Sequence, residues 1–417
     1  MTVTRAPGVD SLDSRPLEGL LVLDFTQFVA GPVCTRALAE LGAEVIKIEL
    51  APTGDHARRL PVLRNGRSAY FIQQNLGKKS LCVDIHQQRG LDLVQRLVVK
   101  ADVMVENFSP GVIGRLGLGW EVVHALNPDL ILCQISAFGQ EGPLANLPGF
   151  DHIGQAYSGI MSLIGDPDAS PPFVGAAIGD VGAGVSALAA LNAALYGRMK
   201  RGGGGERIDV SLLDFYFHGH AVALETYTAS GGEIEHRRSG PDHMAIAPAG
   251  VFKAREGHVV LLPVGEDMWR RLLRAMGRPD LGEDERFHDS PSRYAYRDEI
   301  RRIIEAWFAE QPSDAAAINR LQAERVPCAP VLTVADAIRH PQLLERQTVI
   351  DIDDPALGPF KVPGSLFRLP DRGDLTSRNA PDLGEHNGEI LAEHLGLSAA
   401  EIGQLEAGGV LRSAPVI

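Results

Sequence analysis

Residues 19–135 alternate between short apolar runs of strand length and longer segments with the spacing of an amphipathic helix. Strand-like runs cover residues 19–24, 44–49, 80–84, 101–106 and 130–135, and helical segments cover residues 32–41, 90–100 and 121–126. Strands that alternate with helices predict a mainly parallel sheet with helices on both faces. The chain is therefore expected to have an α/β fold whose ligands bind at the carboxyl ends of the strands.

The turn after the first strand argues against the commonest ligand of such a sheet. Residues 24–32 read Asp-Phe-Thr-Gln-Phe-Val-Ala-Gly-Pro, without the G-x-G-x-x-G pattern that cradles a dinucleotide pyrophosphate. The large domain is therefore expected to be Rossmann-like without NAD, and an NAD-dependent oxidoreductase is disfavoured. Two further loops, residues 106–111 and 136–143, are expected at the same edge of the sheet.

The remaining chain predicts a second, smaller domain and a returning tail. Residues 1–226 are expected to form the N-terminal part of the large domain, and residues 227–246, which contain glycines and arginines, a linker. Residues 247–332 predict a small α+β domain. Residues 333–417 are expected to return to the large domain as its C-terminal part.

Hydrophobic spacing predicts individual elements in these later segments. They are a strand at 207–210, a single helix at 211–228, strands at 251–254 and 258–263, and helices at 268–276, 297–310, 388–395 and 399–407. The longest uncharged run, residues 181–197, is shorter than the ~20 apolar residues that span a bilayer, so a buried helix is expected. Residues 1–19 are polar and are expected to be a loose lead-in rather than a secretory or transit signal.

Charge and cysteine content narrow the class of protein. The 417 residues carry 40 basic against 53 acidic side chains, a formal net charge of −13, which argues against nucleic-acid binding and acidic-membrane binding. Cys34, Cys82, Cys133 and Cys328 form no C-x-x-C pair. Neither a metal site nor a disulfide framework is therefore expected, and a reducing cytoplasm fits best.

Asp180 is the carboxylate with the clearest chemical context. It lies in the glycine-rich residues 173–184, where an apolar segment ends and a helical pattern begins, so it is predicted to be a helix N-cap. Alternatively, Gly179, Gly182 and Gly184 leave room for a ligand, free N–H groups at the helix start receive an oxyanion, and Asp180 is a nucleophile. This stretch alone does not decide between the two interpretations.

Eight motifs, taken in order, resemble one family over nearly the whole chain. They are Leu23-Asp24-Phe25-Thr26 with Ala30-Gly31-Pro32; residues 42–49 with Gly54-Asp55; Asn75 with Lys78-Lys79-Ser80; residues 105–111; Gly149-Phe150-Asp151; Gly179-Asp180; residues 208–214; and Leu383-Gly384-Glu385-His386. Together they resemble the class III CoA-transferases, the family of formyl-CoA transferase and the carnitine CoA-transferase.

The resemblance implies a covalent mechanism on Asp180. The carboxylate would form a mixed anhydride with the acyl group of an acyl-CoA and then an aspartyl-CoA thioester, from which a carboxylic acid acceptor would take the CoA. CoA is then a substrate, and no permanently bound cofactor is implied. At the ordinary aspartate pKa of ~3.9 the carboxylate is unprotonated at pH 7, so no separate general base is expected.

The resemblance also implies CoA contacts from Ala30, Asn107, Phe108 and Arg115. Phe108 would stack on the adenine and Arg115 would bind a phosphate, the alternatives being packing in the core and a surface ion pair. Lys78 and Lys79 are expected to be solvated surface lysines.

Gln27, Asp151 and Gly179 are expected to support the active site. Formyl-CoA transferase has His and Gln at the positions of Gln27 and Val29, so the role of its glutamine does not carry over to this chain. The mobile glycine-rich loop of that enzyme has no clear counterpart here.

Two other functions of this fold are weighed against CoA transfer. The α-methylacyl-CoA racemases use a histidine in a Gly-His-Asp segment as a second acid/base, and this chain has Phe150 there, which cannot move a proton. His152 would have to be redirected to replace it. A non-catalytic acyl-CoA-binding protein would not require Asp180.

The resemblance further implies an interlocked homodimer, threaded through long linkers near residues 227–247 and 331–341. The acceptor is expected to be a small di- or hydroxy-carboxylic acid, because a second carboxylate needs a cationic partner and the first linker supplies Arg237, Arg238 and His243.

Overall fold

The computed structural model describes residues 15–377 and 379–413. The greater part of the expected lead-in, residues 1–14, lies outside the described residues. The chain forms two compact units. The large unit contains the residues up to Ser158, Val174–Gly219 and the residues from Pro341 onward, and the small unit contains Gly159–Phe173 and His220–His340.

The large unit is built on a parallel sheet, as the sequence predicts. Its strands are β1 (Leu21–Asp24), β2 (Glu44–Leu50), β5 (Lys79–Val83), β6 (Val103–Glu106), β7 (Ile131–Ser136) and β8 (Arg207–Ser211). They pair in the order β5-β2-β1-β6-β7-β8, and every pair is parallel. This is the order of doubly wound nucleotide-binding sheets, in which the chain reverses direction across the sheet between β1 and β6.

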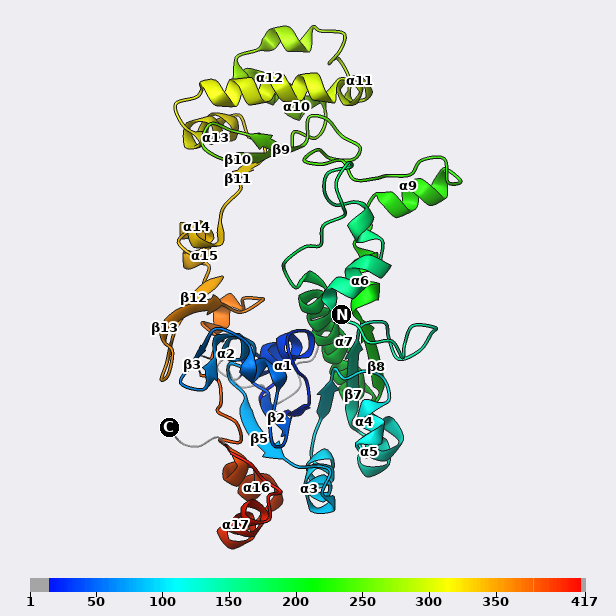
Figure 1. Cartoon of the computed structure of the whole chain (residues 1–417), viewed down its shortest axis with the longest axis vertical. Coiled ribbons are helices and arrows are strands. Elements are labelled where there is room, and N and C mark those ends of the chain that lie inside the picture. The colour runs from blue at the N-terminus through cyan, green and yellow to red at the C-terminus, as the bar shows by residue number, and fades with distance from the viewer. Residues whose placement is uncertain (1–14, 378, 414–417) are drawn as a thin grey trace, which may run out of the picture. The chain divides into compact units, whose positions relative to one another are not determined.

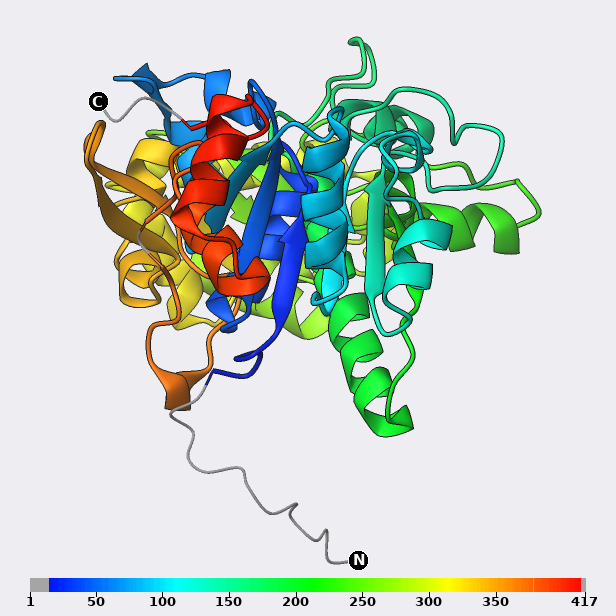
Figure 2. The same ribbon diagram turned by 90° about the horizontal axis from the view of Figure 1, so that it is seen from below.

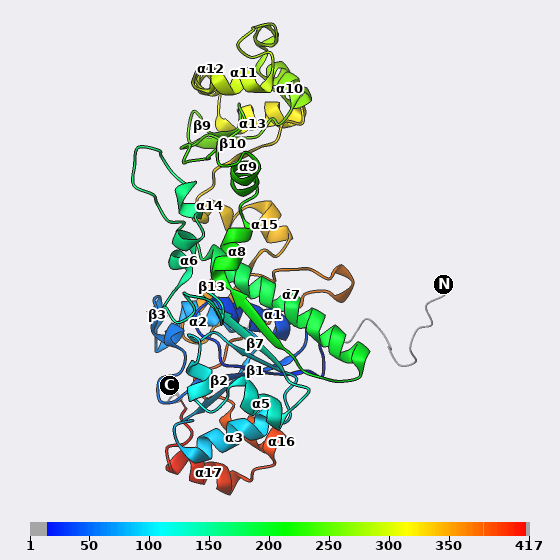
Figure 3. The ribbon, with the colours of Figure 1, turned by 90° about the vertical axis from the view of Figure 1, so that its right-hand side faces the viewer.

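Helices cover both faces of this sheet (Figure 3). One face carries α1 (Ala30–Glu40) and α7 (Ile178–Arg201), and the other carries α3 (Gln88–Val98), α5 (Trp120–Leu126), α16 (Asn387–Leu395) and α17 (Ala399–Ala407). Figure 2 shows α16 and α17, in red, lying along the sheet although they come from the end of the chain. Buried residues from the returning tail, such as Ile390 and Leu405, join the same core as Leu23 and Leu81.

The apolar helix α7 packs one of its sides against α1 and the sheet. Ala183, Ala187 and Leu191 belong to the core that it shares with α1 and the sheet. By length and composition α7 could also cross a membrane, but one such helix is weak evidence for a membrane span. Its buried residues and its contact with the sheet agree with the core helix that the sequence predicts.

Shorter elements of the large unit surround the ends of the strands. They are η1 (His56–Arg59), β3 (Leu63–Arg64), β4 (Arg67–Ser68), α2 (Ala69–Gln74), α4 (Val112–Arg115), α6 (Asp151–Tyr157), α8 (Leu212–His218), α15 (Pro341–Glu345), β12 (Val349–Asp354), β13 (Gly358–Pro363) and η4 (Pro370–Arg372). The single helix predicted at 211–228 is wrong. α8 begins where the Ser211 side chain accepts a hydrogen bond from the Asp214 amide, and it ends at Gly219.

The small unit has its own core. An antiparallel sheet of β9 (Gly250–Lys253), β10 (His258–Leu261) and β11 (Cys328–Pro330) is accompanied by α10 (Glu266–Met276), α12 (Arg297–Glu310) and α13 (Asp314–Ala323) (Figure 1). The other elements are η2 (Ile160–Ser162), α9 (Ala223–Ala229), η3 (Pro279–Gly282), α11 (Ser290–Ala295) and α14 (Val334–Ala337). The sequence does not reveal β11, because a proline such as Pro330 is tolerated only on a strand at the edge of the sheet.

Candidate active site

The two strands at the reversal point of the sheet send their loops into one cleft. β1 ends at Asp24 and β6 ends at Glu106, side by side in the parallel ladder. The following loops are joined by the Asn107 side chain, whose Oδ1 accepts a hydrogen bond from the Gln27 amide at 2.7 Å and whose Nδ2 donates to the Gln27 carbonyl at 2.8 Å. The Asn107 side chain therefore clamps the two loops together.

Buried charged side chains support the loop that follows β1 and contains Gln27. Lys78 Nζ lies 2.8 Å from Asp24 Oδ2 and also donates to Thr35 Oγ1 and Asn75 Oδ1. Burial favours a raised pKa for Asp24, but the neighbouring ammonium of Lys78 outweighs it and holds that pKa at about 2. The expectation that Lys78 is a solvated surface lysine is therefore wrong, because Lys78 is the buried counter-ion of Asp24.

A second buried lysine extends this support to the tip of the loop. Lys47 Nζ donates to the Thr26 carbonyl at 2.6 Å and forms an ion pair with Asp55 at 3.0 Å. Just beyond, Phe28 has a φ of 63°, a left-handed conformation that is costly for an aromatic residue. The loop conformation is thus imposed by its contacts rather than by local preference.

The cleft has a volume of about 220 Å³. It is lined by Gln27, Phe28, Val29, Ala30, Asn107, Phe108, Ser109, Ile135, Ser136, Ala137, Pro148, Gly149, Phe150, Asp180 and Leu212. Gln27, Ala30, Asn107, Phe108 and Asp180, all selected from the sequence, are therefore brought together. Arg115 is exposed on α4 and is not among the lining residues.

Asp180 lies in the first turn of α7. The helix begins at Ile178 after an N-cap at Ala177 that makes no side-chain hydrogen bond, so the predicted N-cap role of Asp180 is wrong. A carboxylate in the first turn is still favoured by the helix dipole. Its oxygens are not used to cap the helix, and among the described residues that line the cleft Asp180 is the one that carries a charge.

The glycines around Asp180 serve packing rather than ligand access. A Cβ on Gly179 would lie 2.1 Å from the Tyr216 ring, and a Cβ on Gly182 would lie 2.1 Å from the Phe215 ring. A Cβ on Gly184 would lie 2.5 Å from the Ala30 carbonyl oxygen. The expectation that they open a path for a ligand is wrong, because α8 and α1 pack closely against α7 at these positions.

A second carboxylate, that of Asp151, contacts the backbone of Asp180. Asp151 Oδ1 accepts a hydrogen bond from the Asp180 amide at 2.9 Å. Asp151 Oδ2 accepts from the Tyr216 hydroxyl at 2.7 Å and from Gln155 Nε2 at 3.0 Å. The Asp180 amide is therefore occupied and does not serve as the free oxyanion donor expected from the sequence.

Burial and the neighbouring charge of Asp151 raise the pKa of Asp180 to about 7. The expectation of an ordinary aspartate, fully ionised at pH 7, is therefore wrong. A carboxylate of higher basicity is also a stronger nucleophile once it is deprotonated.

The Phe108 loop rests on Glu106. Glu106 is buried, and its carboxyl accepts hydrogen bonds from the Phe108 amide and from Gln134 Nε2, each at 2.7 Å. Burial raises the pKa of Glu106 to about 7. The Phe108 side chain lines the cleft and also packs against the core of the sheet, so part of its ring surface is already covered.

Comparison with known proteins shows the family of this chain. The family model described as CoA-transferase family III matches residues 17–387. The chain belongs to CoA-transferase family III.

Relatives of this family III CoA-transferase match it almost from end to end. The succinyl-CoA–D-citramalate CoA-transferase of Chloroflexus aurantiacus is 34% identical over 400 residues, which cover 95% of this chain and 98% of that protein. The succinyl-CoA:glutarate CoA-transferase of Mus musculus is 33% identical over 412 residues, 98% of this chain and 93% of that protein. A crystal structure of a CaiB/BaiF family protein from Brucella suis superposes with a TM-score of 0.79 at 34% identity, covering 91% of this chain and 99% of that one.

The basic residues of the linker are engaged elsewhere in this CoA-transferase. The Arg238 guanidinium donates to the carbonyls of Asp166, Pro167 and Ala169. Arg237 pairs with Glu235 at 2.7 Å, and His243 Nδ1 accepts from the Ala245 amide. The expectation that these residues are available to hold an acceptor is therefore not supported for Arg238, whose donors are committed to the backbone.

The residue at the racemase histidine position forms part of the cleft wall. Phe150 is 67% exposed, lines the cleft and meets Phe28 edge-on, with ring centroids 6.0 Å apart. His152, two residues on, is exposed on α6 and does not line the cleft. The position where racemases place their second acid/base therefore has no titratable side chain here.

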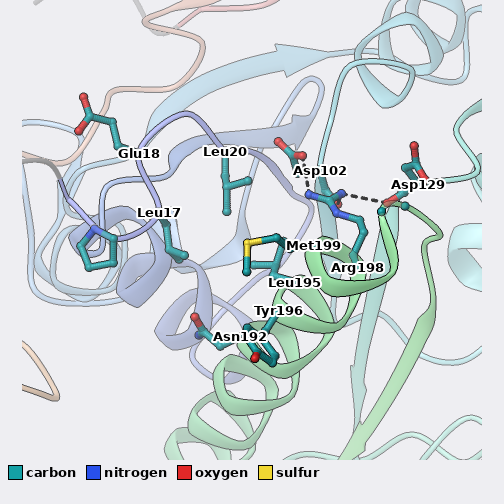
Figure 4. Close-up of a pocket in the computed structure, with 13 residues that line it drawn as sticks. Leu17, Glu18, Leu20, Asp102, Asp129, Asn192, Leu195, Tyr196, Arg198 and Met199 are labelled. Carbon is teal, nitrogen blue, oxygen red and sulfur yellow. Dashed lines mark hydrogen bonds and ion pairs between the residues drawn. The ribbon is translucent and has the colours of Figure 1, made fainter. Parts of the chain in front are cut away.

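A larger cavity, of about 620 Å³, lies beside the C-terminal half of α7 (Figure 4). Arg198 donates to Asp102 Oδ1 at 2.7 Å, which pairs these two charges, and to the Asp129 backbone carbonyl at 3.0 Å. Leu195, Tyr196 and Met199 form much of the remaining wall. None of the residues that line this cavity belongs to the motifs identified in the sequence, so the smaller cleft is the candidate active site.

One group of side chains in the described residues has the geometry of a metal site. Glu44, Glu393 and His394 bring three ligand atoms together. The ammonium of Lys79 lies among them, 2.7 Å from Glu44 and 3.5 Å from Glu393. The lysine supplies the positive charge that a cation would bring.

Proposed function

We propose that this CoA-transferase moves CoA from a succinyl-CoA-type donor to a small di- or hydroxy-carboxylic acid through covalent intermediates on Asp180. The observation that carries the proposal is the position of Asp180 as the one charged residue lining the cleft at the reversal point of the sheet. Its raised pKa combines ionisation near neutral pH with the basicity of a good nucleophile.

In the proposed reaction a carboxylate oxygen of Asp180 attacks the thioester carbonyl, the C–S bond breaks, and CoA leaves as the thiolate. The thiolate attacks the aspartyl carbonyl of the resulting anhydride, which releases the donor acid and leaves an aspartyl-CoA thioester. The acceptor carboxylate displaces the thiolate to form a second anhydride. Attack of the thiolate on the acceptor acyl carbon gives the new thioester and regenerates Asp180.

We assign CoA recognition to Ala30, Asn107, Phe108 and Arg115, and support of the nucleophile to Gln27, Asp151 and Gly179. Asn107 acts by holding both loops through its two hydrogen bonds to Gln27, and Glu106 fixes the turn that carries Phe108. Arg115 is exposed on α4, and we assign its guanidinium to a phosphate of CoA. CoA is a substrate in this proposal, with no permanently bound cofactor.

The proposed substrate class follows the relatives, whose names specify succinyl-CoA with D-citramalate or with glutarate. The cleft lining offers amide and hydroxyl groups from Gln27, Ser109 and Ser136 and no cationic side chain. Hydrogen bonds from such groups can select a hydroxylated or doubly carboxylated acid.

A screen of acceptors tests this assignment. With succinyl-CoA as donor, dicarboxylates and hydroxy-dicarboxylates are expected to accept CoA at least about 10-fold faster than monocarboxylates of equal length, because buried polar groups left unpaired cost binding energy. Product thioesters are identified by mass. Faster transfer to monocarboxylates throughout the panel contradicts the proposed substrate class.

We also propose that the enzyme acts in the cytoplasm as an interlocked homodimer. Tyr196 and Met199 on α7 are 60% and 72% exposed, which is unusual for large apolar side chains. This exposure favours a second protein surface that covers them in the dimer. The four cysteines are free thiols, in keeping with a reducing compartment.

The dimer is expected to persist on dilution, since an interlocked pair buries a large obligate interface. Sedimentation velocity at nanomolar concentration, with activity measured on the same sample, is the test. A folded and active monomer at that concentration contradicts the interlocked arrangement.

A further inference from the structure

Tyr216 is a buried polar residue whose place beside the nucleophile no sequence motif indicates. Its side chain comes from α8, 4% exposed, and its hydroxyl donates to Asp151 Oδ2 at 2.7 Å. The other oxygen of Asp151 accepts from the Asp180 amide at 2.9 Å. The phenol is therefore one residue removed from the nucleophile.

Asp151 depends on such donors because it is 4% exposed and no ion pair with a cation is found for it in the described part of the chain. A buried carboxylate without a counter-ion is tolerated when hydrogen bonds stabilise its charge. Three donors do so here: the Asp180 amide, the Tyr216 hydroxyl and Gln155 Nε2. Gln155 is itself held by hydrogen bonds with the Val174 backbone.

The ring of Tyr216 occupies the space that a side chain on Gly179 would need. A Cβ at Gly179 would lie 2.1 Å from Tyr216 Cε2 and 2.8 Å from Asp151 Oδ1. Burial, together with the hydrogen bond to Asp151, raises the pKa of Tyr216 to about 12. The phenol therefore stays protonated, and remains a donor, throughout the neutral pH range.

Two more titratable groups act on this cluster from other elements. Tyr70, on α2, has a pKa raised to about 12 by burial and by the charges of Asp180 and Asp55. Asp55 is neutralised by its ion pair with Lys47. Tyr70 is uncharged at neutral pH, so the charges nearest to Asp180 are set chiefly by Asp151.

We propose that Tyr216 is a positioning residue for the transfer reaction, which acts through Asp151 to set the pH at which Asp180 becomes a nucleophile. The inference rests on the proposed function for its catalytic readout. Without the phenol, the negative charge of Asp151 loses a donor that partly offsets it and acts more strongly on Asp180, which then keeps its own proton to higher pH. Without the charge of Asp151, Asp180 loses its proton at lower pH.

Two substitutions therefore shift the activity in opposite directions. In kcat/KM for the acyl-CoA donor against pH, Tyr216→Phe is expected to move the acidic limb upward by about one unit and Asp151→Asn to move it downward by at least about one unit. Tyr216→Phe is then about 10-fold slower below the limb and within about 2-fold of wild type at pH 9. Tyr157→Phe, an exposed tyrosine on the helix of Asp151, is the matched control and keeps the wild-type limb.

Thermal unfolding supplies a readout that does not require activity. The difference in Tm between wild type and Tyr216→Phe is expected to grow from pH 5 to pH 9, because the lost hydrogen bond stabilises the ionised pair most. An equal loss of kcat/KM and of Tm at every pH makes Tyr216 merely structural and overturns the inference. If the wild type transfers no CoA, the proposed function fails, whereas a Tm difference that still grows with pH supports the coupling of Tyr216 to the carboxyl pair.

Discussion

Asp180→Asn is expected to lower CoA transfer by at least about 10³-fold while CoA binding and the fold survive. The amide keeps the shape of the side chain but has no nucleophilic oxygen. Wild-type protein incubated with acyl-CoA alone is expected to carry an acyl or CoA adduct that hydroxylamine or borohydride traps, and peptide mapping is expected to place it on Asp180.

The same substitution is expected to stabilise the protein above neutral pH. The folded-state pKa of Asp180, about 7, lies above the ordinary aspartate value, so ionisation costs stability progressively as pH rises from about 4 to 7. Removing the charge is expected to raise the free energy of unfolding at pH 8 by about 2–4 kcal/mol, measured by urea denaturation.

Two outcomes contradict the assignment of Asp180. One is full turnover by Asp180→Asn, with mass spectrometry excluding deamidation back to aspartate and Asp180→Ala as a second variant. The other is a trapped adduct on another residue such as Glu106 or Cys34, both of which are buried away from solvent.

Lys78→Met is expected to lower the free energy of unfolding by about 3–5 kcal/mol, because it leaves the Asp24 carboxylate buried without its nearest cation. Methionine approximates the length of the lysine stem, so the loss reports charge rather than volume. Urea denaturation at pH 7 is the measurement.

The adjacent lysine provides the matched control. Lys79 lies at the surface, its side chain 28% exposed, in ion pairs with Glu44 and Glu389. Lys79→Met is expected to cost less than about 1 kcal/mol. Equal effects of the two substitutions would contradict a special role for the buried pair, and Asp24→Asn combined with Lys78→Met is expected to recover part of the lost stability.

The parallel sheet was predictable because the strands buried on both faces leave near-continuous apolar runs, separated by helical spacing. The position of the cleft followed from the same reasoning, since ligands bind at the carboxyl ends of such strands. Errors arose where local signals compete. Gly219 follows the last residue of α8 inside the helix expected at 211–228, and Pro327 and Pro330, before and at the end of β11, conceal an edge strand.

Side-chain environments were less predictable than elements. Lys78 and Lys79 are adjacent in sequence, yet Lys78 is buried against Asp24 and Lys79 is partly exposed in ion pairs with Glu44 and Glu389. Tyr216 carries no motif, and the one available signal is its spacing of four from the buried Leu212 on one face of a helix. That spacing indicates burial and says nothing about a partner 65 residues away in the chain.

The sequence by itself determined the class of fold, and it singled out the edge of the sheet and the carboxylate on which the proposed function rests, because these depend on local spacing and on motifs. Only the tertiary structure decided the chemical state of that carboxylate. Asp180 is an ordinary aspartate in sequence, and its raised pKa comes from burial and from Asp151, which is brought beneath it by α6. Burial and charge act through space, so they exist only once distant segments have packed together.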